Sequence, residues 1–503
     1  MSTSLIISLV SCYFIVLMVI SWVTSRKSNN NSFFLGDRKS PWYIVAFGMI
    51  GASLSGITFI SIPGSIAKYD ESLGLVPASQ FSYMQMVLGY LVGYIIIAYV
   101  LLPIYYRMNL TSIYVYLKHR FGHYSYKTGA SFFLLSRIIG ASIRLLLVAS
   151  VLQLILFDEM GVRFELTVLF SVLLIWLYTN RGGIKTIIWT DTLQTFFMLI
   201  AVVVTVILIK NQLNEGNSKS YYDILSTSGY TKAFFFNDWL TGNYFWKNFL
   251  GGIFITIGMT GLDQDMMQKN LSCKNLKLAQ LNMLTFSGVL VFVNFIFLVL
   301  GALLFSYYQE TNIGSNALEI IGRTDLLFAE IANSGSLGYG VGILFLLGLI
   351  AAAYSSADSA LTSLTTSFTV DFMNIETKSS AYQERIRKIV HVIMSLVLVL
   401  VIIILRKTSD DSAIWLLIKL AGFTYGPLIA LFFFGILTKR KLLDQYVPII
   451  CVSITFILAL IWGVNNYKLI SWFGEYQFGA EIIIYNSLIS FALLFLVSKK
   501  VKS

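Results

Sequence analysis

Charged residues are scarce in this sequence. Asp, Glu, Lys and Arg make up 12% of its 503 residues, whereas ordinary soluble domains have about 25%. Hydrophobic residues account for 57% of the chain. A composition so poor in charge and so rich in apolar side chains is not that of a water-soluble domain, and it predicts a polytopic membrane protein.

Cysteine and histidine are also rare. The three cysteines are Cys12, Cys273 and Cys451. The three histidines are His119, His123 and His391. Neither set is grouped, so we expect no disulfide framework and no metal site built from these residues. A membrane enzyme would need a nucleophile, an acid–base pair or a metal site. Because the histidines assemble none of these, we expect that the protein is not an enzyme.

Long polar segments are missing as well. The longest polar gaps, near 212–242 and 308–336, are loop-sized, which predicts a single integral membrane domain, 1–503. Apolar stretches long enough to cross a bilayer lie near 3–23, 41–68, 77–106, 124–157, 163–180, 184–211, 243–266, 281–307, 337–371, 388–406, 412–437, 446–463 and 480–498. Because backbone groups in lipid must be hydrogen-bonded internally, and these stretches are too long for barrel strands, we predict an all-α protein with about thirteen transmembrane helices.

The chain is basic, with a net charge of +11, but the placement of this charge does not indicate a nucleic-acid partner. Most loop Lys and Arg fall in alternate loops, at 24–40, 107–123, 179–185, 267–280, 372–387, 438–445 and 499–503. The positive-inside rule then predicts an outside N-terminus and a cytoplasmic C-terminus, with Arg406 and Lys407 as an exception. We expect a multi-pass protein of the plasma (inner) membrane, surrounded by lipid, with no protein partner implied.

An acid and three serines interrupt the ninth apolar stretch. A charge at bilayer depth costs about 2.5–3.5 kcal/mol, so the side chain of Asp358 is predicted to face a protein interior, an ion path or a cationic partner. The spacings of three and four residues allow side chains or carbonyls to converge on one helix face. Alternatively, the serines bond back to carbonyls of their own helix, which leaves Asp358 unexplained. The residues of this stretch that could form such a face are Ala352, Ser355, Ser356, Asp358 and Ser359.

The second apolar stretch also contains a break. Residues 51–58 include two glycines and three hydroxyl side chains, and Pro63 follows. Such residues lower helix propensity and remove a backbone donor, which favours local unwinding. Unwound carbonyls can face a cation. Close packing between membrane helices explains the small residues equally well, and both interpretations stay open.

A second buried acid follows the pair Gly182-Gly183, which is predicted to turn the chain at the inner face. Asp191 lies about two turns into the next helix. Its neighbours are Thr190, Thr192 and Gln194. This arrangement indicates a polar site within the membrane. The alternative is an interfacial acid paired with Lys185 or Arg181.

The chain resembles the sodium/solute symporter family, which includes sodium–glucose, sodium–proline, sodium–iodide and sodium–sialate transporters. The resemblance covers essentially the whole chain. It is carried by five runs: LTSIYVYLKHRFG at 110–122, GGIKTIIWTDTLQ at 182–194, DQDMMQK at 263–269, SSADS at 355–359 and AGFTYGP at 421–427. Because all five runs occur in the order and the membrane topology of the family, the chain is identified as a member of it.

The resemblance implies a leucine-transporter-like fold of two inverted five-helix repeats, 41–211 and 243–437. The first helix with its inner loop (1–40) and the last two helices (438–503) would be peripheral. Broken helices opening each repeat would place substrate and ion near the midplane. This agrees with the interruption at 51–64 and with a second one at 258–261.

The resemblance also implies sodium as the coupling ion. The family's main sodium site falls on the carbonyls of Gly51 or Ala52, Leu54 and Ala352, and on the hydroxyls of Ser355 and Ser356. Some members bind another sodium ion, and that site maps onto Asp191, Ser355, Asp358 and Ser359. Many relatives carry a neutral residue where Asp358 stands. An acid there could tighten sodium binding, change the stoichiometry or admit a proton.

The solute cavity is implied by position. It would be lined by Ser55, Thr58, Phe81, Gln85, residues near Gly258, and Arg137 or Arg144. The two arginines are seven residues apart and share a helix face, and a guanidinium suits a carboxylate bidentately. In a sialate transporter of the family an arginine of this helix has that role, but its position aligns near Gly140. The alternative is a structural arginine paired within the bundle.

We therefore predict a sodium-coupled secondary active symporter that imports a small organic solute, sugar-like or carboxylated, by alternating access. A proton-coupled symporter of the same fold is one alternative. A membrane sensor that reuses the bundle is another, since some relatives are fused to kinase domains, although we expect no such domain in this sequence. A channel would differ by showing conductance without uphill accumulation.

Overall fold

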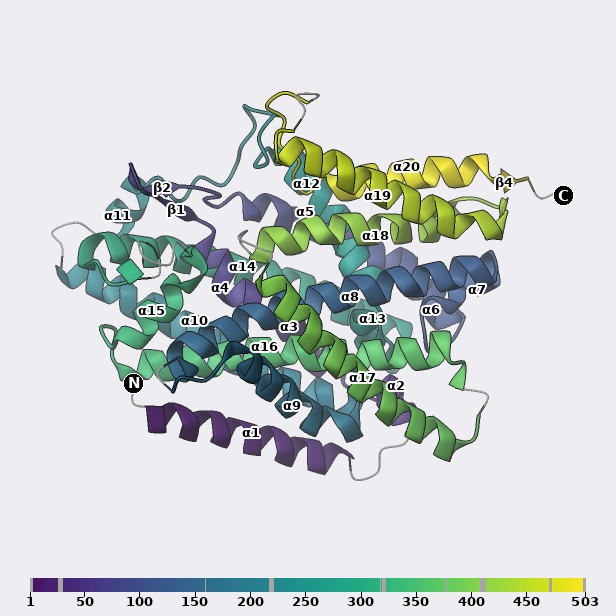
Figure 1. Ribbon diagram of the computed structural model, residues 1–503, viewed down its shortest axis with the longest axis horizontal. Coiled ribbons are helices and arrows are strands. Elements are labelled where there is room, and N and C mark those ends of the chain that lie inside the picture. Colours follow the sequence, from purple (N-terminus) through teal and green to yellow (C-terminus); the bar gives the residue numbers. More distant parts are fainter. Residues whose placement is uncertain are drawn as a thin grey trace.

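The structure is a computed structural model that consists almost entirely of helices (Figure 1). It describes residues 3–25, 30–158, 160–216, 221–316, 318, 323–375, 378–407, 413–469 and 473–500. Part of the predicted basic tail 499–503 lies outside these residues. Every predicted apolar stretch overlaps a helix, and the predicted all-α class is confirmed.

The elements follow one another as predicted from the apolar stretches. The helices of the first half are α1 (Thr3–Ser25), α2 (Asn30–Leu35), α3 (Trp42–Ser53), α4 (Gly56–Gly64), α5 (Tyr83–Ile96), α6 (Leu102–Arg107), α7 (Val115–Arg120), α8 (His123–Leu152), α9 (Phe164–Gly182) and α10 (Ile184–Gly216). Those of the second half are α11 (Tyr221–Thr227), α12 (Phe245–Thr256), α13 (Gln264–Leu271), α14 (Leu276–Thr311), α15 (Leu327–Ser334), α16 (Tyr339–Ser367), α17 (Ser380–Arg406), α18 (Ala413–Leu437), α19 (Val447–Asn466) and α20 (Ile482–Leu496).

Strands are few and short in the described part of the chain. The antiparallel pair β1 (Ala67–Asp70) and β2 (Gly74–Pro77) forms a hairpin after α4. The antiparallel pair β3 (Lys441–Leu442) and β4 (Ser498–Lys499) joins the segment after α18 to the end of α20.

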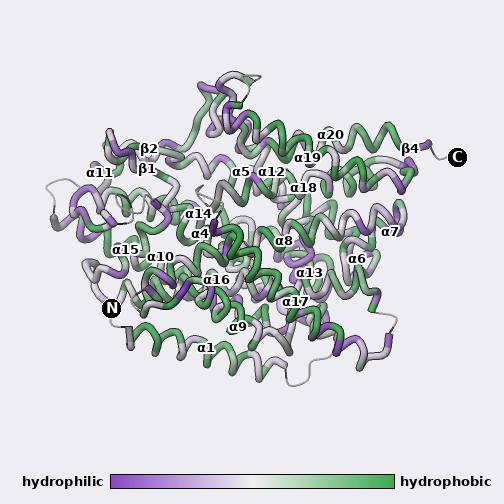
Figure 2. Tube along the Cα trace, viewed as in Figure 1, coloured by the Kyte–Doolittle hydropathy of each residue, from purple (hydrophilic) through white to green (hydrophobic). Residues whose placement is uncertain are grey.

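Nine of the described helices are long and apolar enough to cross a membrane, and the bent pair α3–α4 would make a tenth span. The helices at 164–179 and 482–496 are apolar but shorter. Figure 2 shows most hydrophilic segments at the two ends of the bundle and hydrophobic segments along the helices between them. The first and last described residues lie at opposite ends (Figure 1). The number of about thirteen spans stays a prediction.

Helix α16 is the central element of the bundle. It packs against α10, α8, α17, α3 and α4, and nearly all its side chains are buried. In Figure 1, α1 lies along one edge of the molecule, and α19 and α20 lie along the opposite edge. The division into two repeats with peripheral first and last helices stays a prediction.

Both predicted helix interruptions are present. Helix α3 ends at Ser53 and α4 begins at Gly56, with a bend of 51° between them. Helix α12 continues into a π-helical turn, η4 (Ile257–Gly261), and the chain leaves the helix at Leu262 before α13 begins. The first interruption lies against α16, and the second lies against α5, α13 and α18.

Candidate functional site

The break between α3 and α4 lies beside the serines of α16. Leu54 (φ −82°, ψ 74°) and Ser55 (φ −73°, ψ 177°) depart from helical backbone. The last carbonyls of a helix have no partner within it, so α3 presents carbonyl oxygens here. Ser356 Oγ lies 3.4 Å from the carbonyl oxygen of Ala52. Predicted main-site groups from α3 and from α16 therefore meet, and Ser355 and Ser356 are fully buried.

Close packing also explains the small residues of α3. A Cβ at Gly51 would lie 2.2 Å from Thr195 Oγ1, and one at Gly48 would lie 3.2 Å from Asp191 Cβ. Both contacts are with α10. The two interpretations of the 51–58 segment are thus compatible, because the glycines let α3 approach α10 while the break exposes carbonyls toward α16.

Asp191 is fully buried on α10 and contacts two donors. The Ser355 hydroxyl donates to Asp191 Oδ1 at 2.6 Å. Lys269 Nζ, from α13, lies 2.8 Å from Asp191 Oδ2. The alternative that paired Asp191 with Lys185 is wrong, because Lys185 lies 3.9 Å from Asp37 Oδ2 instead. The side chain of Arg181 lies outside the described residues.

Asp358 is held by uncharged donors. The Tyr178 hydroxyl donates to Asp358 Oδ2 at 2.9 Å, and the backbone N–H of Ser359 donates to Oδ1 at 2.5 Å. No Lys or Arg of the described chain lies within ion-pair distance of this carboxylate. The Ser359 hydroxyl is buried without a hydrogen-bond partner among the described residues.

The two arginines of α8 differ sharply. Arg137 forms a short hydrogen-bonded ion pair with Asp265 and lies 3.8 Å from Asp263 Oδ2. Asp263 also accepts a hydrogen bond from the Tyr425 hydroxyl at 2.7 Å. The alternative of a structural arginine, paired within the bundle, thus describes Arg137.

Arg144 has no such partner. Its side chain is 7% exposed, and its Nε and Nη1 atoms are buried without a hydrogen-bond partner in the part of the chain that the structure describes. Both arginines line a cavity of about 90 Å³. The complete lining is Ala52, Ser53, Ser55, Thr58, Tyr83, Tyr90, Tyr94, Arg137, Arg144, Ile255, Thr256, Met259, Thr260, Met266, Leu417 and Ile418.

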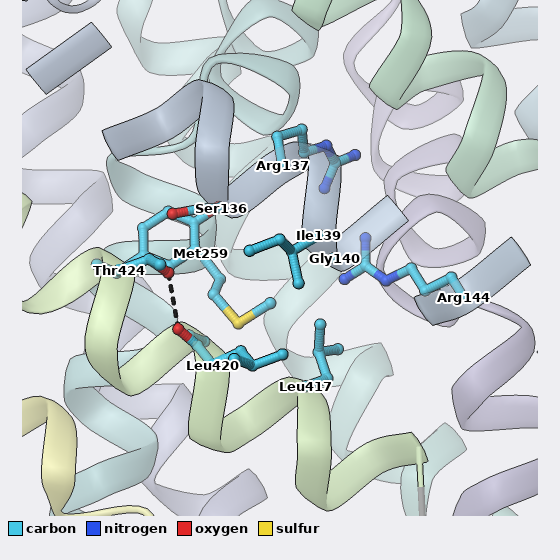
Figure 3. A pocket seen from close by; sticks show the side chains of 11 residues that line it. Ser136, Arg137, Ile139, Gly140, Arg144, Met259, Leu417, Leu420 and Thr424 are labelled. Atoms are coloured by element: carbon cyan, nitrogen blue, oxygen red, sulfur yellow. Dashed lines mark hydrogen bonds between the residues drawn. The ribbon is translucent and has the colours of Figure 1, made fainter. Parts of the chain in front are cut away.

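A smaller hollow of about 10 Å³ shares part of this lining (Figure 3). In Figure 3 the side chains of Arg137 and Arg144 come from one helix, and those of Leu417, Leu420 and Thr424 come from another, α18. Gly140, the position near which the resemblance implied a solute-binding arginine, lines this hollow together with Arg144.

Three predicted cavity residues lie elsewhere. Phe81 packs edge-to-face on Phe295. Gln85 holds the loop before α12, donating to the Asn243 carbonyl at 2.9 Å and accepting from the backbone N–H of Phe235 at 3.0 Å. Gly258 lies against Tyr425: a Cβ added at Gly258 would lie 2.7 Å from the Cβ of Tyr425. Of the predicted solute residues, the cavity lining contains Ser55, Thr58, Arg137 and Arg144, and it also contains Met259 and Thr260, which are the predicted residues near Gly258.

The sequence interpretation missed an aromatic wall on α5. Tyr83, Tyr90 and Tyr94 line the cavity, and the hydroxyls of Tyr83 and Tyr90 are 3.2 Å apart. Spacings of seven and four residues place all three on one helix face. That periodicity is the sequence signal that could have identified them.

Comparison with known proteins adds the following. A sequence profile of the sodium:solute symporter family matches residues 33–442. The sodium/sialic acid symporter SiaT of Proteus mirabilis (strain HI4320) is 27% identical over 474 residues, 89% of this chain and 87% of that protein. The sodium/sialic acid symporter NanT of Aliivibrio fischeri (strain ATCC 700601 / ES114) is 24% identical over 426 residues, 82% and 79% of the two chains.

The fold is shared with a solved transporter structure. The substrate-bound outward-open state of a Na+-coupled sialic acid symporter superposes with a TM-score of 0.79 at 20% identity, over 99% of both chains. This likeness confirms the predicted leucine-transporter-like arrangement.

Proposed function

Because the chain belongs to the sodium:solute symporter family, we propose that its central cavity binds a carboxylated solute through Arg144. The chain is a multi-pass membrane transporter that couples sodium to the import of a small organic solute, and its family and relatives are transporters. The finer proposals below concern which residues bind the solute and the ion.

The observation that carries the proposal is the unpaired guanidinium of Arg144. A buried charge is costly unless it is paired and hydrogen-bonded, and Nε and Nη1 of Arg144 have no protein acceptor among the described residues. A guanidinium binds a carboxylate with two parallel hydrogen bonds. Arg137 is excluded from this role by its pairing with Asp265 and Asp263.

The rest of the cavity suits a polar organic solute. A water needs about 10–15 Å³ on this scale, so 90 Å³ accommodates several waters or a small ligand. Hydroxyl groups of Tyr83, Tyr90, Ser55 and Thr58 lie in its walls, where they offer both donors and acceptors. A sugar-like acid provides hydrogen-bond partners for these hydroxyl groups, whereas a purely apolar solute does not.

For the coupling ion we propose a site at the break between α3 and α4. Its ligands would be carbonyls of α3 and hydroxyls of α16, and the 3.4 Å contact between Ser356 Oγ and the Ala52 carbonyl supports this placement. Ser355 donates its hydrogen to Asp191, which leaves oxygen lone pairs for a cation. The proposed ligands are Gly51 or Ala52, Leu54, Ala352, Ser355 and Ser356.

The proposed mechanism is alternating access. Sodium that bridges α3 and α16 stabilises the outward-facing state, and its release toward the cytoplasm loosens that contact. Coupling requires that sodium and solute each favour binding of the other. One sodium ion contributes about 2.3 kcal/mol per 100 mV of membrane potential, and a tenfold sodium gradient adds about 1.4 kcal/mol.

The test is uptake of a library of sugar acids, monocarboxylates and their neutral amides into proteoliposomes under an inward sodium gradient. We expect sodium-dependent accumulation of an acid but not of its amide. Arg144→Gln should raise the KM for that acid about 10- to 100-fold, because a charge-assisted hydrogen bond contributes about 1.5–3 kcal/mol. Ser355→Ala should abolish sodium dependence.

Arg163→Gln is the matched control. Arg163 lies at the start of α9 with its side chain 82% exposed, so its loss should leave uptake unchanged. Equal transport of acid and amide, together with an unchanged KM in Arg144→Gln, would refute the carboxylate proposal while leaving sodium-coupled symport intact.

A further inference from the structure

Both carboxylate oxygens of Asp191 already contact protein donors. Ser355 Oγ donates to Oδ1 at 2.6 Å, and Lys269 Nζ lies 2.8 Å from Oδ2. Asp191 belongs to the predicted second cation site. A second sodium ion therefore cannot use both oxygens of this carboxylate unless a donor leaves.

The ammonium group of Lys269 lies between two carboxylates. The side chain is 1% exposed and forms ion pairs with Asp191 at 2.8 Å and Asp265 at 3.8 Å. At 2.8 Å the contact between Lys269 Nζ and Asp191 Oδ2 has the length of a charge-assisted hydrogen bond. The ammonium group is therefore held mainly by Asp191, and Asp265 is its more distant partner.

Lys269 lies on a short segment of chain. Helix α13 runs only from Gln264 to Leu271, between the Leu262–Asp263 break and the turn at Ser272. It packs against α16, α10 and α3. All its residues are buried, so Lys269 is positioned by a short helix that is enclosed by the longer ones.

Two hydroxyl groups of α16, one of them in the predicted second cation site, lack hydrogen-bond partners among the described residues. Ser359 Oγ and Thr362 Oγ1, on α16, are fully buried and have no hydrogen-bond partner among the described residues. Buried hydroxyls without partners are uncommon in folded proteins. With Ser355 they stand four and three residues apart, which places them along one helix face. These oxygens offer ligands to a second, mobile cation.

We propose that the Lys269 ammonium is a tethered cation that occupies the Asp191 side of the second sodium site, so that Lys269 and a second sodium ion exclude one another. The inference rests on the proposed sodium site between α3 and α16, which supplies the first ion. Two cations at one carboxylate repel each other strongly in a buried site. The wild-type protein then binds one sodium ion, and the lysine supplies the other positive charge.

The experiment is equilibrium binding of radioactive sodium to the purified full-length protein without solute. We expect about one bound ion per wild-type molecule and about two in Lys269→Gln, with sodium half-saturation lowered about fivefold or more because the competing cation is gone. Lys269→Arg keeps the charge and should bind one ion. Lys247→Gln, which removes another buried lysine, near Glu481, should also bind one.

Thermal unfolding in sodium and in choline is the second measurement. Lys269→Gln should be stabilised by sodium more than the wild type, because the ion replaces the lost ammonium. The double variant Asp191→Asn/Lys269→Gln removes both charges together and should bind one ion with the wild-type sodium response.

The outcomes that would contradict the tethered-cation proposal differ from the outcome that would contradict the main sodium site. Two sodium ions bound to the wild type, or one bound to Lys269→Gln, would overturn the tethered-cation proposal, and the wild-type measurement decides even if the glutamine variant does not fold. Two ions bound to the double variant would also overturn it, because the second ion would then not need Asp191. No sodium bound to the wild type would instead refute the proposed main site.

Discussion

At the scale of single residues, the partners of a buried charge separate its roles. Arg137 and Arg144 share a helix, a face and nearly complete burial, yet one is paired with carboxylates and the other is not. The first stabilises the bundle, and the second is available to a ligand. This difference assigns different phenotypes to two substitutions that look equivalent in sequence.

Arg137→Gln should lower stability rather than solute affinity. It removes the ion-pair partner of Asp263 and leaves Asp265 only the more distant Lys269, at 3.8 Å, and breaking a buried ion pair costs about 3–5 kcal/mol. We expect the thermal unfolding midpoint of the detergent-solubilised protein to fall by several degrees. Arg144→Gln is the matched comparison, because it removes an arginine that has no ion-pair partner among the described residues. An unfolding midpoint of Arg137→Gln equal to that of the wild type would contradict the structural role.

The sequence located several site residues but not their pairings. Asp191 and Ser355 were both expected at the second cation site, and the structure brings them to 2.6 Å. The run 263–269 was noticed as a family motif, yet its acids and lysine were given no role. Arg137 and Asp265 are 128 residues apart, and neither periodicity nor spacing shows that α13 brings Asp265 within reach of Arg137 but not of Arg144, although both arginines line the cavity.

At the scale of helices, the contact between α3 and α10 depends on glycine. Gly51 allows the backbone of α3 to approach Thr195 and the carbonyl of Asp191. The same segment carries the proposed sodium ligands. Helix packing and ion binding are therefore linked, because a change that separates α3 from α10 also displaces the carbonyls at the break.

Gly51→Ala should destabilise the protein by about 1–3 kcal/mol, the usual cost of overpacking. The added Cβ would lie 2.2 Å from Thr195 Oγ1, so Thr195→Ala in the same chain should recover much of the loss. Gly288→Ala on α14 is the control, since a Cβ there meets nothing within 4 Å and alanine favours a helix by about 1 kcal/mol. Thermal unfolding of the three variants measures the effect. Equal midpoints for Gly51→Ala and Gly288→Ala would argue against close α3–α10 packing.

At the scale of the whole molecule, the apolar stretches predicted the path of the chain well. The length and apolar composition of a stretch are sufficient to locate a membrane helix, because the thickness of the bilayer sets the length and its hydrocarbon core requires apolar side chains. The two breaks were also predicted, since glycine and proline mark them locally. Length and composition do not set the number of spans, because α9 and α20 are short and α12 is continued by a π-helical turn.

The orientation of the molecule stays a prediction that labelling can check. We propose an outside N-terminus and a cytoplasmic C-terminus, which places the β1–β2 hairpin outside and β4 inside. In a cysteine-free background, Ser72→Cys should react with a membrane-impermeant maleimide in intact cells, because Ser72 is exposed in that hairpin. Lys499→Cys should react only after permeabilisation. The reverse pattern would invert the topology.

The bend between α3 and α4 has an electrostatic consequence of its own. The peptide dipoles of a helix leave partial negative charge at its C-terminus and partial positive charge at its N-terminus. At this bend the C-terminal end of α3 and the N-terminal end of α4 lie two residues apart, and Ser55, which precedes α4, lines the cavity with Arg144. One break thus creates an attractive field for a cation and, beside it, one for an anion. Sodium and a carboxylate would each reduce the repulsion that the other meets there, so the backbone itself contributes to their coupling.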